Sequence, residues 1–267
     1  IKEAPKITRR YDLDYYYSVV AKSNIPNYDN LWQKMALDQF SHEYGQELFE
    51  YMHGALERYK QALFARDIIR DVLEVGTDND IVFLVNFHFY YFITLIKALG
   101  DNLAWILNYF YRLGLQATPG QIDLTKTSFR NKLESANKAL FKNICQGSGY
   151  ENYRKLRDFR DIVIHKHALH VVAVQMRMSG PKKVMVPIDP TTGVMVDNLK
   201  RQKQRSMSKV VSDKQSIAKY GLKEMVVALV PEEDLQYEDI IIFCERHLKF
   251  IAESYGQALK DILSEAK

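Results

Sequence analysis

The residues best suited to chemistry gather in one helix-forming segment late in the chain, residues 153–170. It holds arginines, aspartates and three histidines around an aliphatic stretch. No GxGxxG, GxxxxGK[ST], HExxH or GxSxG pattern occurs anywhere in the sequence. Dinucleotide folds, P-loops, zincins and α/β-hydrolases therefore lose their usual support. This segment is left as the principal candidate for a site.

Arg160 is the most unusual residue of this segment. On a helical wheel of about 100° per residue it falls inside the apolar arc, between Tyr153 and Leu156. A buried guanidinium is costly unless it is paired or faces a site. His165 lies about 140° away on the same wheel, so the two side chains converge only with distortion or across a symmetric interface.

The sequence from Arg160 to His165 resembles the HEPN superfamily. Its hallmark is an arginine, four to six residues and then a histidine, with Asn, Asp or His after the arginine. Here Asp161 follows the arginine, and aliphatic residues separate it from His165. His167 fits the longer spacing, and His167 and Arg157 are the alternative site residues. The resemblance covers these ten or so residues and, loosely, the helical scaffold.

What the resemblance implies is metal-independent RNA cleavage at a composite site between two copies of the chain. His165 would take the proton from a ribose 2′-hydroxyl, Arg160 would hold the scissile phosphate, and Asp161 would orient either partner. RNA and a second copy are the implied partners, with an antitoxin or another regulatory protein as a further one. The implied setting is a cytoplasmic toxin or phage-defence effector without a cofactor.

Several other interpretations remain open. Arg160 could pair with a carboxylate inside the bundle while His165 ends a helix, which would make the chain a non-catalytic module for nucleic acid or protein. A small-molecule sensor is a weaker alternative. His165, His167 and His170 form an HxHxxH pattern that suits a metal, but no carboxylate or Cys follows closely, so no metal site is predicted. His88 is predicted to be a hydrogen-bonded core histidine.

A basic segment, residues 199–223, is the second candidate. It contains eight basic residues and one acidic residue. A solvated connector would explain this balance, and so would an arm that grips the RNA backbone. The residues assigned to RNA binding are Lys200, Arg201, Lys203, Arg205 and Lys209.

The elements that must position these residues are mainly helical. About five helices are predicted, with a small antiparallel β insertion before the last one. The predicted helices span residues 30–75, 77–113, 128–144, 151–168 and 232–266, and the predicted strands span 169–178, 183–188 and 224–231. The tyrosine-rich residues 1–29 are predicted to form an extended arm. The rest, 30–267, would be one domain with its β-rich, basic insertion at about 169–231.

Composition agrees with a globular chain. Its 267 residues are 47% hydrophobic and 26% charged, with a net charge of +4. The two cysteines, Cys145 and Cys244, exclude a disulfide scaffold and a CxxC zinc site. The uncharged run Ile81–Ile96 is shorter than the roughly twenty residues of a spanning helix, so it is predicted to be a buried helix and not a membrane span.

Overall fold

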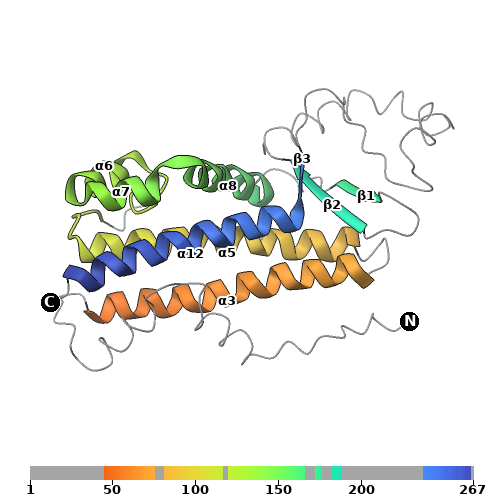
Figure 1. Cartoon of the computed structure of the whole chain (residues 1–267), viewed down its shortest axis with the longest axis horizontal. Helices are drawn as coiled ribbons and strands as arrows, with labels where there is room; N and C mark the ends of the chain where they lie inside the picture. The colour runs from red at the N-terminus through yellow and green to blue at the C-terminus, as the bar shows by residue number, and fades with distance from the viewer. Residues whose placement is uncertain are drawn as a thin grey trace. The chain divides into compact units, whose positions relative to one another are not determined.

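The computed structural model describes residues 45–75, 81–116, 120–165, 172–175, 182–187 and 237–265. The predicted mainly α fold, with a small antiparallel sheet before the last helix, is confirmed (Figure 1). The helices are α3 (Gly45–Val75), the π-helical turn η2 (Ile81–Val85), α5 (Asn86–Phe110), α6 (Thr127–Ala136), α7 (Lys138–Cys145), α8 (Gly147–His165) and α12 (Ile240–Glu265). The strands are β1 (Val172–Gln175), β2 (Lys182–Pro187) and β3 (Tyr237–Asp239).

The chain divides into two compact units. The described residues of the first are 66–75, 81–90, 157–165 and 237–244, together with β1 and β2. Those of the second are 45–65, 91–116, 120–156 and 245–265.

The second unit has a helical core. On α3, Leu48, Met52, Tyr59 and Leu63 are buried, at the spacings of four and seven that keep one helix face inward. Side chains of four further helices share this core: Phe92, Ile96, Leu99 and Leu103 of α5, Leu133 of α6, Leu140 and Ile144 of α7, and Ile251, Tyr255 and Leu259 of α12.

The first unit combines helix segments with the sheet. Its strand order is β1-β2-β3, and both pairs are antiparallel, with Val172 opposite Met185 and Met185 opposite Asp239. Among its helical residues, Phe243 packs edge-to-face against Phe89 and Phe159, with ring centroids 5.3 and 5.4 Å apart. Such edge-to-face pairs are favoured by the ring quadrupoles.

The predicted helix 128–144 is wrong in one respect, because Asn137 divides it into α6 and α7. Asn137 has an extended backbone, with φ −148° and ψ 92°. Its side-chain oxygen accepts a hydrogen bond from the Leu140 amide at 2.9 Å and so caps α7. Its Nδ2 donates to the Tyr111 hydroxyl and to Asp261 of α12. Residue periodicity passes smoothly through 137, so only these contacts reveal the break.

The last helix begins at Ile240 and not directly after Pro231. Tyr237–Asp239 pairs with β2 as strand β3, which gives this stretch of backbone its hydrogen-bond partners. Asp239 then caps α12, since its Oδ1 accepts from the amides of Ile241 and Ile242 at 2.8 and 3.4 Å. Helix α8 begins at Gly147, earlier than the predicted start at residue 151, and Gly147 itself has a φ of 84°.

Other predictions lie outside the described residues. These are the arm 1–29, helix residues 30–44, the strand 224–231 and the basic segment 199–223. The helix predicted at 81–96 is present in η2 and α5, but it is buried on one side only, because Phe83, Phe87 and Tyr91 are exposed. By length and composition alone, Phe83–Phe110 could cross a membrane, although half of its most apolar window is buried within the protein. Core helices satisfy the same criteria.

Candidate functional site

Helix α8 carries the predicted motif. Its apolar face is the one expected from the sequence, because Tyr153, Leu156 and Phe159 are all buried. Arg160 and Asp161 lie on the last turns, and His165 is the last residue of the helix. One continuous helix therefore connects the arginine to the histidine.

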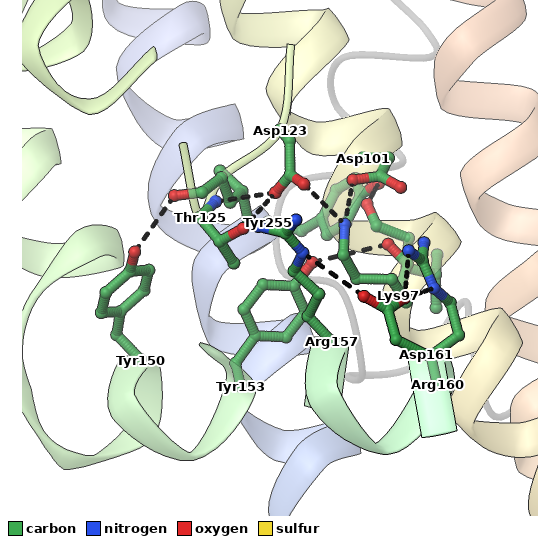
Figure 2. A network of polar contacts seen from close by, with 12 residues as sticks. Lys97, Asp101, Asp123, Thr125, Tyr150, Tyr153, Arg157, Arg160, Asp161 and Tyr255 are labelled. Carbon is green, nitrogen blue, oxygen red and sulfur yellow. Dashed lines mark hydrogen bonds and ion pairs between the residues drawn. The ribbon is translucent and has the colours of Figure 1, made fainter. Parts of the chain in front are cut away.

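Arg160 is paired with its neighbour in sequence. Its Nε and Nη2 donate to Oδ1 of Asp161 at 3.0 and 2.7 Å (Figure 2). The arginine side chain is 30% exposed, so the guanidinium is only partly removed from water. The carboxylate offsets the cost of placing this charge beside an apolar face.

Asp161 lies between two arginines of the same helix. Nε of Arg157 is 3.8 Å from its second carboxylate oxygen, which makes an ion pair one helical turn apart. These three side chains sum to a charge of +1, and the exposed Asp158 brings residues 157–161 to zero. Nη1 of Arg160 makes no hydrogen bond to the described residues. The trio can therefore still hold an anion through Arg160.

The remaining predicted site residues are less fully described. The backbone of His165 belongs to α8, but its side chain lies outside the described part of the chain. His167 lies outside it entirely, as do Lys200, Arg201, Lys203, Arg205 and Lys209. Arg160, Asp161 and Arg157 are thus the predicted residues that the structure brings together.

A buried lysine network was not predicted from the sequence. Lys97 of α5 is only 1% exposed, yet its ammonium pairs with Asp101 one turn later and with Asp123, 3.3 Å away (Figure 2). The Asp101 side chain is 33% exposed, whereas that of Asp123 is 13% exposed. The i, i+4 spacing of Lys97 and Asp101 could have predicted their ion pair from the sequence. The contact with Asp123 could not, because Asp123 comes from a distant loop.

Asp123 is ionised by its surroundings. Burial opposes its ionisation, but the ammonium of Lys97 and the backbone and hydroxyl hydrogen bonds of Thr125, both 2.8 Å, outweigh burial. Its pKa is consequently lowered from the ordinary value of 3.8. The network fixes the loop before α6 against the middle of α5.

Three buried tyrosines fasten the surrounding helices. Tyr153 donates to the Lys97 carbonyl at 3.4 Å, Tyr255 to the Leu99 carbonyl at 2.8 Å and Tyr150 to the Leu124 carbonyl at 3.3 Å. Burial raises the pKa of Tyr153 and Tyr255 well above the ordinary value and that of Tyr150 to about 12. All three stay protonated near neutral pH, so they act here as hydrogen-bond donors and not as bases.

His88 differs in part from its prediction. It is half-buried on α5, and burial lowers its pKa. Its ring meets Phe87 edge-on at 5.2 Å, but its buried Nδ1 has no hydrogen-bond partner among the described residues. The expected hydrogen bond is therefore missing at that atom.

The described residues contain no group of three or more His, Cys, Asp or Glu that could hold a metal. Cys145 and Cys244 are buried and do not form a disulfide bond. Burial, only partly opposed by the charge of Arg130, raises the pKa of Cys145 to about 12. That thiol is therefore a poor nucleophile near neutral pH.

No protein-family model, no curated protein and no solved structure matches this chain.

Proposed function

We propose that the chain is a metal-independent endoribonuclease of the HEPN type, active as a homodimer in the cytoplasm and serving as a toxin or defence effector. The observation that carries the proposal is the common helix of Arg160, Asp161 and His165. Arg160 is partly exposed and is oriented by Asp161, and no described residue hydrogen-bonds its Nη1, which would bind a phosphate oxygen.

In this reaction the ribose 2′-oxygen attacks the adjacent phosphorus, and the bond from phosphorus to the 5′-oxygen breaks. Neutral His165 takes the 2′-proton, while Arg160 stabilises the charge that builds on the phosphate. The departing 5′-oxygen takes up a proton, and the other product ends in a 2′,3′-cyclic phosphate. The second copy of the chain would supply a second Arg160–His165 pair across the dimer.

A non-catalytic module that binds nucleic acid or a protein partner is the second candidate. The observation that favours it is the ion pair of Arg160 with Asp161, since a purely structural arginine needs such a partner. His165 at the end of α8 suits this candidate equally.

Single substitutions separate the two candidates. Arg160→Ala and His165→Ala should each abolish RNA cleavage, while circular dichroism shows a folded protein. Arg157→Ala is a matched control, because Arg157 is also partly exposed and also pairs with Asp161. Loss of activity in Arg160→Ala with retention in Arg157→Ala would assign the phosphate to Arg160. His167→Ala tests the longer spacing. If His167→Ala abolishes RNA cleavage and His165→Ala does not, the assignment of His165 is wrong.

The chemistry gives further tests. Cleavage should persist in EDTA, products should end in 2′,3′-cyclic phosphate, and 2′-O-methyl RNA should be inert because its nucleophile is blocked. Light scattering should give about twice the 31.1 kDa of one chain. A divalent-metal requirement would exclude the proposed mechanism, and wild-type protein without any cleavage would favour the non-catalytic candidate.

A further inference from the structure

Helices α6 and α7 pack side by side (Figure 1). Their sequence carries a concentration of positive charge. Residues 126–145 hold five basic residues and one acidic residue, Glu134. Of the chain's 37 basic and 33 acidic residues this leaves 32 of each, so the whole net charge of +4 equals the excess in these twenty positions. The basic residues are Lys126, Arg130, Lys132, Lys138 and Lys142.

The lysines of this pair of helices point outward and have no ion pair among the described residues. Lys132, Lys138 and Lys142 are exposed, and Lys138 and Lys142 lie one turn apart on the same face of α7. Elsewhere in the described chain, Lys60, Lys97 and Arg160 each pair with a carboxylate. The α6–α7 surface therefore presents lysines that pair with no carboxylate of the described residues.

Arg130 adds a held guanidinium to this surface. Its Cζ lies 5.1 Å from the ring centroid of Tyr150 and 5.7 Å from that of Phe141. Its buried Nε has no hydrogen-bond partner among the described residues, and it pairs with no described carboxylate. Two aromatic faces thus hold the cation in position by cation–π attraction.

The chemistry of this surface suits phosphates. Its exposed neighbours are polar, including Asn131, Ser135 and Asn143, and none of the described large exposed apolar side chains lies on α6 or α7. Protein partners are usually anchored by such apolar side chains, whereas nucleic-acid backbones are bound by lysines, arginines and small polar groups.

We infer that the α6–α7 surface, through the exposed Lys132, Lys138 and Lys142 and the half-buried Arg130, binds the phosphate backbone of single-stranded RNA. The choice of RNA rests on the proposed function. The surface is separate in sequence from the Arg160–His165 motif, so it would bind substrate without taking part in cleavage.

The test measures binding of a short labelled RNA by fluorescence anisotropy over a range of salt concentrations. Every protein is the full chain with His165→Ala, so that RNA is not cut during the measurement. Lys138→Glu/Lys142→Glu should weaken binding by about tenfold or more and should lower the slope of log affinity against log salt by roughly 1.4, the value for two phosphate contacts to a single strand. The control is Lys249→Glu/Lys260→Glu, which reverses two exposed lysines of α12, of which Lys249 lies 3.8 Å from Glu253, and it should change affinity by no more than about twofold.

Arg130 is tested with Arg130→Met, which keeps a long unbranched side chain between the two rings and removes the charge. It should lower RNA affinity severalfold, and Arg130→Lys should restore part of it. If Arg130→Met does not fold, the two lysine pairs decide the outcome alone.

Equal effects of the two lysine pairs, or no effect of the α7 pair, would overturn the inference. Binding of poly-glutamate through the same lysines, without RNA binding, would assign the surface to an acidic protein segment and would also overturn it. If the wild-type protein never cleaves RNA but the α7 pair controls affinity, the cleavage proposal fails and this surface stands. If RNA is cleaved and the two lysine pairs behave alike, the cleavage proposal stands and the assignment of this surface fails.

Discussion

A methyl group on Gly100 would lie 1.7 Å from the hydroxyl oxygen of Tyr153 and 2.4 Å from its Cζ. Helix α8 approaches α5 here only because residue 100 has no side chain. Tyr153 fills the space and donates to the carbonyl of Lys97, so this contact joins the motif helix to the buried lysine network.

Gly100→Ala should destabilise the protein. Alanine in a helix is normally favoured over glycine by about 1 kcal/mol, but here the methyl would overpack a filled site at a cost of about 3 kcal/mol or more. Urea unfolding measures the difference. In a Tyr153→Ala background the same substitution should become neutral or stabilising, and an equal cost in both backgrounds would contradict the contact.

Lys97→Met should lower the free energy of unfolding by about 3 kcal/mol, because Asp123 would keep its buried charge without a cation. Adding Asp123→Asn should recover part of this loss. Asp101 is more exposed and is solvated, so Asp101→Asn should recover less. Denaturant unfolding measures both double variants. If Asp123→Asn and Asp101→Asn recovered equal amounts of unfolding free energy, the greater cost of the buried Asp123 would be contradicted.

Asp123 should give the protein an acid-sensitive step. Because its pKa is lowered in the folded state, its stabilisation is fully present above the ordinary value of 3.8 and is lost as the pH falls below it toward the folded pKa. The unfolding free energy of Asp123→Asn should therefore fall less between pH 4 and lower pH than that of the wild type. Parallel pH profiles of the two proteins would show that Asp123 is not held ionised by Lys97 and Thr125.

Asn137→Ala should destabilise the protein by about 1–2 kcal/mol, since it removes the cap of α7. It also removes the hydrogen bonds to Tyr111 and Asp261. Asn137→Asp would retain the cap but place a carboxylate beside Asp261, so it should not restore wild-type stability. Thermal unfolding of the three proteins at neutral pH, with Asp261→Asn added as a partner variant, distinguishes loss of the cap from repulsion.

The sequence by itself determined the helical class, the buried stripes and the placement of Arg160, Asp161 and His165 on one helix. These follow from local periodicity, because apolar residues that recur every three to four positions lie on one helix face, and that face is buried whatever it packs against. The ion pair of Arg160 could also be expected from the sequence, because its partner Asp161 is the next residue.

The tertiary structure alone decided which residues meet across the chain. Asp123 reaches Lys97 from a loop 26 positions away, and Tyr153 reaches Gly100 from a different helix. Asn137 breaks a smooth helical pattern because Tyr111 and Asp261 accept its side-chain hydrogen bonds. The cationic surface of α6 and α7 likewise depends on which lysines find carboxylates and which do not. Periodicity fixes which face of a helix is buried, but the partner on that face is set by packing between distant segments, which no local pattern encodes.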